Sequence, residues 1–459
     1  MTAGRASRFG AREAYGVVLG GGLLLMLAAN LPGHLSVDSI MQLYEGRMQV
    51  RETFAPAIYS LILRVFDSLV PGTGLYVTAS GLLLYGALIS LRGLVPRVSW
   101  LSVPVALAVV FMPALLVYQG IVWRDVFFAN VSVVGFVCLA HAALRWGERP
   151  MRWAALAAAV GLFALAAIVR QNGLIAVVMG TLVVAWTARS GGWRRMTAYG
   201  VGFLAAVLIL AQALASVAQP RTAGPDQAMG IGLRILLHYD IVAATAQRPD
   251  LPLAQIDAAD AASDDFLRAH AREVYSPERV DYFDRVPDLR KHLWPLPGEA
   301  VRAQWLEIVT DHPKLYIAHR LSVFRWVFLT PDVARCVPVH VGIEGPADKI
   351  EALKLKPGSD PSDRAMADYA ARFFRTPAYS HLTYAMIAVA VTGFLLLRRR
   401  PADWAMAGLM TAGLGFAASF FFISIACDYR YLYFLDLAAL AGLLYVALDP
   451  RLKRGEALA

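Results

Sequence analysis

Apolar stretches close to twenty residues long recur along the chain, and they restrict its fold more than any other feature. A helix needs about twenty apolar residues to cross roughly 30 Å of hydrocarbon. Only 17% of the 459 residues are charged and the mean hydropathy is +0.52, whereas about a quarter of an average soluble domain is charged. The sequence therefore predicts an all-α polytopic integral membrane protein.

About ten stretches are predicted to be transmembrane helices. The first lacks a small-residue cleavage site and is followed by Pro32-Gly33, so we expect a retained helix and no signal peptide. Arg5, Arg8 and Arg12 precede it and other arginines recur in alternate loops, which places both termini in the cytoplasm by the positive-inside rule. The predicted crossings are residues 15–31, 76–91, 100–118, 126–144, 153–169, 174–188, 197–217, 379–397, 404–426 and 431–448.

Residues 218–378 are more polar and contain prolines throughout. Within them, the apolar run 315–329 carries His319, Arg320 and Arg325, and an arginine in mid-bilayer costs about 2.5–3.5 kcal/mol. A crossing there would also put Arg398 and its neighbours outside, so we expect an interfacial helix. The predicted domains are an N-terminal transmembrane module (1–217), a large, mainly helical extracytoplasmic domain (218–378) and a C-terminal transmembrane module (379–459).

The first outer loop, residues 34–70, is predicted to form two amphipathic surface helices. In the first, Asp38, Gln42 and Glu45 are spaced i, i+4 and i+7, which puts them on one face of a helix. The second, residues 57–69, is apolar but short for a crossing and contains Arg64 and Asp67. We expect Asp38 to face a site built from several helix ends on one side of the membrane.

Other charged residues collect in short turns at the same predicted membrane edge. Charges at membrane depth are costly and indicate function by default. Guanidinium groups bind phosphate oxygens in a bidentate manner, and a nearby carboxylate can accept a proton. We therefore predict a shared polar cavity. Its candidate residues are Asp38 and Asp125 as catalytic groups, and Gln42, Arg124, Arg170, Asn172, Asp428 and Arg430 as substrate- or lipid-phosphate-binding groups.

The order of these motifs resembles the GT-C class of membrane glycosyltransferases, in its bacterial form. SVDSIMQ followed by FAPAIYSLILRVFDSL resembles the first outer loop of that class, which carries the catalytic aspartate; WRDV resembles its basic-acidic turn, and VRQNGLI, DYRY and DHPKLYIAHR resemble further motifs. The resemblance covers roughly residues 15–188 and the C-terminal turn. Two departures are that Ser39, not a second acid, follows Asp38, and that Phe54-Ala55-Pro56 stands where many members have His-Pro-Pro.

The resemblance implies transfer of a sugar from a polyprenyl-phosphate-linked donor to a hydroxyl of a glycan, lipid or protein acceptor, on the extracytoplasmic face of the bacterial inner membrane. Asp38 would be the general base of an inverting displacement, Arg124, Arg170 and Arg430 would hold the departing phosphate, and Asp125 would orient them. No metal ligand is assigned, and a divalent cation is left open as a cofactor. The expected partners are the donor, the acceptor and the bilayer, but no nucleic acid.

Other interpretations of the same residues stay open. An O-antigen-type polysaccharide polymerase or ligase would use His312, His319 and Arg320, and a non-enzymatic lipid or solute transporter would place charges along a path through the membrane. Structural roles are also open: Asp38 and Asp125 as helix caps, Arg170 as a snorkelling residue, and Asp428 with Arg430 as an ion pair. Cys336 and Cys427 both lie outside the predicted membrane core, and the sequence leaves their pairing undecided.

Overall fold

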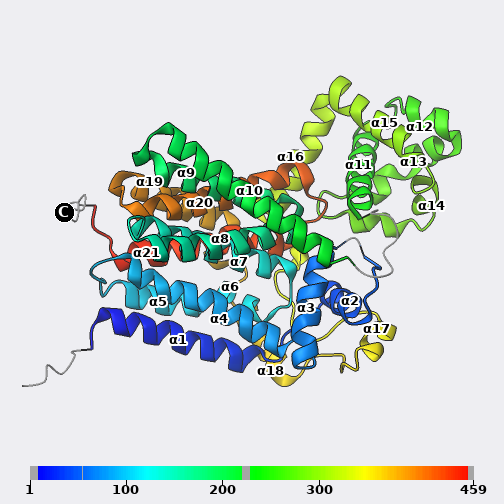
Figure 1. Cartoon of the computed structure of the whole chain (residues 1–459). Helices are drawn as coiled ribbons and strands as arrows, with labels where there is room; N and C mark the ends of the chain where they lie inside the picture. The colour runs from blue at the N-terminus through cyan, green and yellow to red at the C-terminus, as the bar shows by residue number, and fades with distance from the viewer. Residues whose placement is uncertain (1–8, 54, 220–227, 453–459) are drawn as a thin grey trace, which may run out of the picture.

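The computed structural model describes residues 9–53, 55–219 and 228–452, and within these ranges the chain is almost entirely helical (Figure 1). Nine of the described helices are long and apolar enough to cross a membrane, or ten if a bent pair is counted as one. The predicted fold class, an all-α polytopic membrane protein, is confirmed. The membrane-length helices are α1 (Ala11–Asn30), α4 (Gly74–Ser90), α7 (Arg124–Leu144), α8 (Arg149–Val169), α9 (Leu174–Thr187, extended by 3₁₀ turns), α10 (Trp193–Val217), α19 (His381–Arg398), α20 (Pro401–Ile423) and α21 (Tyr433–Leu448).

The predicted crossing at 100–118 is not one straight helix. It forms α5 (Ser102–Val110) and α6 (Pro113–Leu116) with a following 3₁₀ turn, and the two parts meet at 63°. Pro113 lacks an amide hydrogen and holds the preceding Met112 in an extended conformation, which interrupts the helical hydrogen bonds. The segment still traverses the bundle, because Ser99 donates to the carbonyl of Leu448 at one end and Gly120 accepts from the amide of His34 at the other.

Buried polar side chains hold the second half of this broken crossing. The amide groups of Gln119 and Asn130 exchange two hydrogen bonds of 2.9 and 2.8 Å. Gln119 also donates to the hydroxyl of Tyr433, which in turn donates to the carbonyl of Ala114 on α6. Backbone groups freed by the bend are thus hydrogen-bonded inside the protein, as the absence of water in a bilayer requires.

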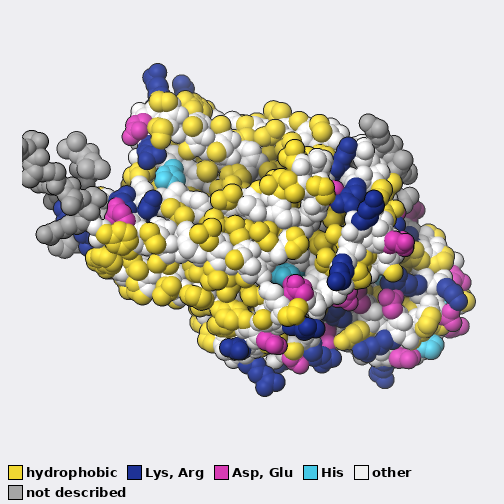
Figure 2. Space-filling model, turned by 90° about the horizontal axis from the view of Figure 1, so that it is seen from below, with side chains coloured by type: hydrophobic (Ala, Val, Ile, Leu, Met, Phe, Trp, Pro, Cys, Tyr) yellow, Lys and Arg dark blue, Asp and Glu magenta, His cyan; other side chains and the backbone are white. Residues whose placement is uncertain are grey.

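The two ends of the bundle differ in what covers them. One end, which we call the domain end, carries α2 (Val37–Met48), α3 (Ala57–Leu69) and residues 228–378. At the opposite end, which we call the loop end, the described connections are short and rich in arginine. There Arg398 is fully buried against Asp403, and Arg400 pairs with Asp449. Figure 2 shows a broad apolar band between these ends, with charged side chains gathered beyond it.

Residues 228–378 form two parts at the domain end. Helices α11 (Ala228–Gln247), α12 (Ala254–Ala259), α13 (Ala261–Val274), α14 (Leu289–Leu293) and α15 (Gly298–Asp311) pack into a helical lobe that stands away from the bundle (Figure 1). Helices α17 (Ala347–Ala352) and α18 (Pro361–Ala371) lie instead beside α2 and the end of α1. The chain between them passes over the start of α2.

Helix α16 (Pro313–Leu329) joins the lobe to the bundle, because it packs against both α11 and α20. One face buries His319 and Arg320, whereas Ile317 and Leu321 on another face are exposed. A helix is therefore present at residues 315–329, and its place in the membrane interface stays a prediction. Three residues used in the sequence interpretation, Arg5, Arg8 and Phe54, lie outside the described residues.

Candidate functional site

A cluster of charged side chains gathers at the domain end around Asp38, in the first turn of α2. The amino end of a helix favours an acidic residue there. The carboxylate does not cap α2, because Ser36 is the N-cap residue. Instead, Asp38 Oδ2 accepts a hydrogen bond of 2.6 Å from Nη2 of Arg430, which follows it by 392 residues. The Asp38 side chain is 50% exposed, so an incoming molecule can reach it.

Arg430 connects the loop after α1 to the turn before α21. It lies in the 3₁₀ turn before α21, and its Nη2 atom also donates to Asp428 Oδ2 at 3.2 Å. Its guanidinium lies 4.8 Å from the ring centroid of Trp123, a favourable cation–π distance. The indole of Trp123 is fixed in turn by a 2.9 Å hydrogen bond to Ser36. Three segments distant in sequence therefore meet at one guanidinium.

Arg124 and Arg170 bring two more guanidiniums to the cluster. Arg170 follows α8 and forms a 2.6 Å ion pair with Asp125, and both side chains are over nine-tenths buried. Rings of Phe420 and Tyr431 flank Arg170. Arg124, at the start of α7, has no hydrogen bond or ion pair to any described residue, and its charge acts on both Asp38 and Arg170. Arg124 is therefore the cation available to an incoming anion.

The arginines keep Asp38 ionised. Desolvation by the surrounding protein acts to raise the pKa of Asp38, but the charges of Arg430, Arg124 and Arg170, together with the Arg430 hydrogen bond, outweigh it. The pKa of Asp38 therefore lies below its ordinary value. The carboxylate is deprotonated throughout the neutral pH range and can accept a proton.

Two predicted site residues, Gln42 and Asn172, lie outside the network of charged contacts around Asp38. The Gln42 side chain is 3% exposed, packed one helical turn after Asp38. Asn172 donates a 2.9 Å hydrogen bond to Ser419 of α20. Glu45, on the same face of α2, accepts from the backbone amides of Glu52 and Thr53 and from the Ser60 hydroxyl, so it closes the turn after α2. Among the described residues, neither Gln42 nor Asn172 forms a hydrogen bond with the arginines of the cluster.

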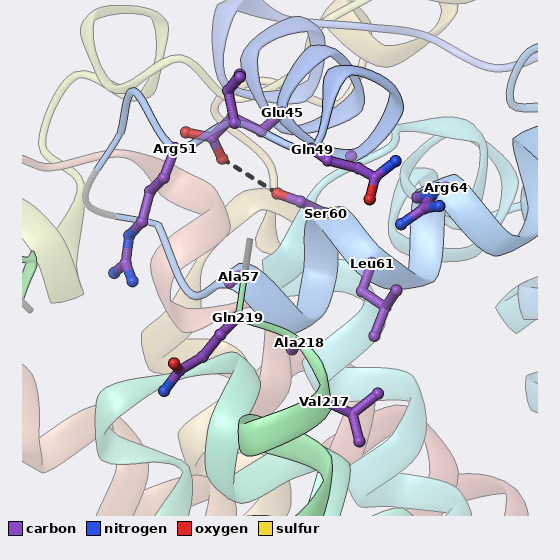
Figure 3. A pocket seen from close by; sticks show the side chains of 12 residues that line it. Glu45, Gln49, Arg51, Ala57, Ser60, Leu61, Arg64, Val217, Ala218 and Gln219 are labelled. Atoms are coloured by element: carbon purple, nitrogen blue, oxygen red, sulfur yellow. Dashed lines mark hydrogen bonds between the residues drawn. The ribbon is translucent and has the colours of Figure 1, made fainter. Parts of the chain in front are cut away.

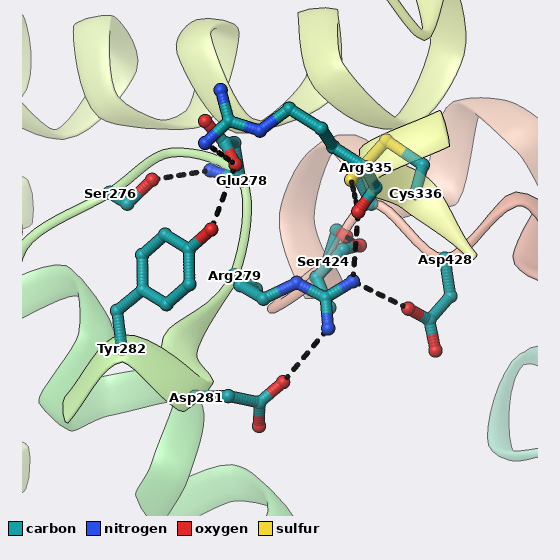
Figure 4. Close-up of a disulfide and its surroundings, with 11 residues drawn as sticks. Ser276, Glu278, Arg279, Asp281, Tyr282, Arg335, Cys336, Ser424 and Asp428 are labelled. Carbon is teal, nitrogen blue, oxygen red and sulfur yellow. Dashed lines mark hydrogen bonds and ion pairs between the residues drawn. A yellow bond between two sulfur atoms is a disulfide. The ribbon is translucent and has the colours of Figure 1, made fainter. Parts of the chain in front are cut away.

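The charge cluster continues into the helical lobe (Figure 4). Asp428 accepts a 3.2 Å hydrogen bond from Arg279, which also lies 3.5 Å from Asp281. A disulfide between Cys336 and Cys427 lies beside Asp428 and ties the chain after α16 to the last turn. This pairing decides what the sequence left open. Sequence reasoning missed Arg279 and Trp123, because only long-range contacts give them a place in the site.

A hollow beside the site is a separate feature. It lies between the turn after α2, the start of α3 and the end of α10, and its lining includes Glu45, Arg64 and Val217 (Figure 3). Asp38 and the three arginines of the cluster do not line it. Among the described residues, no group of three or more histidine, cysteine or acidic side chains is arranged to hold a metal ion.

Two of the three residues that a polymerase or ligase would use, His319 and Arg320, are engaged in the core of the lobe, whereas His312 is half-buried beside Arg248. Asp240 of α11 forms an ion pair with Arg320, lies 3.0 Å from Nε2 of His319, and accepts from the indole of Trp305 at 2.7 Å. Arg320 and His319 are at most 1% exposed. Arg320 also donates to the carbonyl of Ser424. These contacts join α11, α15, α16 and the end of α20, which indicates a structural role.

The chain is similar in structure to one protein of known structure, and no match by sequence accompanies it. No family model matches the chain, and no curated protein matches it. Among solved structures, it is similar to an archaeal oligosaccharyltransferase, AglB from Archaeoglobus fulgidus, in complex with an inhibitory peptide and a dolichol-phosphate, with a TM-score of 0.38 and 13% identity. The match covers 94% of this chain and 50% of that one, so this chain spans about half the length of AglB. A likeness of this size carries no functional argument, and function has to be inferred from this chain's own residues.

Proposed function

We propose that the protein is a membrane glycosyltransferase that moves a sugar from a polyprenyl-phosphate-linked donor to an acceptor hydroxyl at the domain end. One observation carries the proposal. A carboxylate with a lowered pKa stands among the guanidiniums of Arg124, Arg170 and Arg430, at the end of an apolar helical bundle. This set combines a base with an anion-binding site where a lipid-linked phosphate would arrive.

The proposed reaction is an inverting displacement. Asp38 takes the proton of the acceptor hydroxyl while the acceptor oxygen forms a bond to the anomeric carbon. The bond between that carbon and the phosphate oxygen breaks, and its electron pair leaves on the phosphate. Arg124, which forms no hydrogen bond or ion pair with the described residues, binds the phosphate, and Arg170 and Arg430 add positive charge where negative charge develops. Asp125 is a positioning residue, because it holds Arg170.

Donor binding also frees the base in this scheme. Arg430 contacts Asp38 and Asp428 at the same time. A phosphate beside Arg430 competes with Asp38 for the guanidinium. A guanidinium can bind two phosphate oxygens at once, which favours replacement of Asp38 by the phosphate. Asp38 then loses its hydrogen-bonded partner and can accept the proton of a hydroxyl.

We further propose that the domain end faces away from the cytoplasm. The arginine-rich connections of the loop end agree with the positive-inside rule. The Cys336–Cys427 disulfide lies at the domain end, and disulfides persist in oxidising compartments outside the cytosol. With an impermeant maleimide on intact cells, a cysteine at Asp348 should react, whereas a cysteine at Glu148 should react only after permeabilisation. The reverse pattern would invert the orientation.

The alternatives fit the structure less well. The polymerase or ligase interpretation needs accessible His319 and Arg320, and both are buried around Asp240. A transporter needs charges along a path through the membrane. The buried pair His381–Asp436 lies instead in the first turns of α19 and α21, near the domain end.

The test is the Asp38→Asn variant, which keeps the size of the side chain and removes its basicity. Transfer should fall by about 10²–10⁴-fold, the usual contribution of a general base, with unchanged folding. Asp348→Asn is the matched control, because that side chain is 72% exposed on α17. The readouts are the surface glycans and the carrier-linked sugar that accumulates in a deletion strain. Normal glycans with Asp38→Asn would refute the proposal.

A further inference from the structure

A short stretch of the outer chain, Val337–Gly345, lies across the start of α2; we call it the cover segment. Leu35 donates to the carbonyl of Gly342 at 2.8 Å, and Glu344 donates back to the carbonyl of Leu35 at 2.9 Å. The amide of Gly342 donates to Nδ1 of His34 at 3.1 Å. Gly345 lies so close to Ile40 that an added Cβ would be 3.0 Å from it. The cover segment is therefore fixed to α2 three residues before Asp38.

His340, in the middle of the cover segment, lies beside the charge cluster. Its ring centroid is 6.5 Å from that of Trp123, whose other neighbours are Arg430 and Ser36. The charge of Arg430 also acts on the imidazole. His340 thus belongs to the surroundings of Asp38 although it comes from the outer part of the chain.

The Nε2 atom of His340 is shielded from solvent and has no hydrogen-bond partner among the described residues. Most buried polar atoms in proteins have a partner, and His340 Nε2 is one of twenty buried side-chain nitrogen and oxygen atoms in the described residues that lack one. The neighbouring His34 shows the ordinary case: its Nε2 lies 3.0 Å from Asn30 Oδ1 and its Nδ1 accepts from Gly342. This nitrogen is therefore open to a hydrogen bond from a group outside the described residues.

The imidazole is neutral at neutral pH. Desolvation is the main effect that lowers the pKa of His340, and the charge of Arg430 lowers it further. Hydrogen bonds with the backbone of Leu35 and Gly342 and the charge of Glu344 act to raise this pKa, but they do not outweigh the desolvation. A neutral imidazole offers one N–H and one lone pair. A hydroxyl group, which can donate or accept, complements either, whereas a phosphate is better matched by the arginines.

We propose that Nε2 of His340 hydrogen-bonds a substrate hydroxyl held next to Asp38, so that His340 is a specificity-determining residue. This inference rests on the proposed function. The hydroxyl belongs either to the transferred sugar or to the acceptor. Phe at position 340 keeps a ring against Trp123 and removes both nitrogens, and Gln restores a polar group near the Nε2 position.

The experiment uses the full-length protein in nanodiscs, with the carrier-linked sugar that accumulates in the deletion strain as donor. His340→Phe should raise a Michaelis constant about tenfold, as expected for one lost hydrogen bond, with an unchanged melting temperature, and His340→Gln should recover part of the loss. If the KM of the donor and its hydrolysis without acceptor both change, the hydroxyl is on the sugar. If only the KM of the acceptor changes, it is on the acceptor.

Unchanged constants for both substrates in His340→Phe would overturn the inference, as would losses in both variants that simply follow a lower melting temperature. His270→Gln, at an exposed site in the lobe, is the matched control. Asp38→Asn is measured in parallel. If Asp38→Asn is inactive but His340→Phe is normal, this inference alone fails, whereas an active Asp38→Asn variant shows that the proposed function has failed.

Discussion

Asp38 and Arg430 are 392 residues apart in the chain, and their side chains meet at 2.6 Å at the domain end of the bundle. Arg430 holds Asp428 as well, and through Asp428 the contact extends to Arg279 in the helical lobe. The position of the proposed base, Asp38, therefore depends on contacts from α2, from the turn before α21 and from the helical lobe.

Removal of Arg430 should move the acid limb of the pH–rate profile to higher pH. The pKa of Asp38 is held down against desolvation by the charge of Arg430 and of its neighbours. Since a base acts only when deprotonated, activity is lost as pH falls through the pKa of Asp38. Arg430→Gln raises that pKa, so its activity should fall at a higher pH than that of the wild type. The value of kcat/KM for the donor across pH 4–8 reports the pKa of the free enzyme and so measures the shift, and coincident acid limbs would contradict it.

Replacement of Arg124 should weaken donor binding without loss of stability. Arg124 has no ion pair within the described part of the chain, so Arg124→Gln should leave the melting temperature unchanged. The KM of the donor should rise about 10–150-fold, as for a lost hydrogen bond to a charged group. Asp125→Asn is the contrast, because it leaves the buried Arg170 without its partner and should lower the melting temperature. Equal melting temperatures for the two variants would be the unexpected result.

Arg320 should matter for stability and not for catalysis. Arg320→Met removes the ion pair of the buried Asp240 and leaves it only His319 and Trp305 as contacts among the described residues. Loss of one member of a buried ion pair costs about 3–5 kcal/mol. The rate constant per folded molecule should stay near the wild-type value. Thermal unfolding in detergent, combined with activity normalised to folded protein, separates the two effects. A fully folded but inactive variant would favour the polymerase or ligase interpretation.

The disulfide should stabilise the last turn next to the site. Its two cysteines are separated by 91 positions in the sequence. Removal of a native disulfide typically lowers the free energy of unfolding by about 2–5 kcal/mol. The double variant Cys336→Ser with Cys427→Ser should therefore unfold at lower temperature and lose activity as Asp428 and Arg430 loosen. Cys138→Ser, which removes the free cysteine in α7, is the control. An unchanged melting temperature in the double variant would argue against a stabilising role.

The transmembrane helices could be predicted because their signal is local. Residues 57–69 were predicted as a surface helix, and α3 spans Ala57–Leu69. The break at Pro113 was missed, although its cause is local, because the apolar content of residues 100–118 is continuous. A scan for length and hydropathy does not register one missing amide hydrogen.

The partners within the site could be predicted only in part. Charges in short turns indicated that Asp38, Arg124, Arg170 and Arg430 lie at one surface, and the structure brings them together. Their roles in catalysis stay predictions. His340 could not have been found, because a long outer segment returns to α2 through backbone hydrogen bonds that carry no sequence signature.

The meeting of Asp38 with Arg430 also sets when the protein becomes competent during its synthesis. Asp38 enters the membrane region early, whereas Arg430 follows α20 and is made shortly before α21. A nascent chain that has inserted only its first helices has a carboxylate without its guanidinium and a lobe without its disulfide. If the proposed function holds, competence for transfer begins only when the last helical pair is inserted, and we expect truncated chains in the membrane to be inert toward lipid-linked sugars.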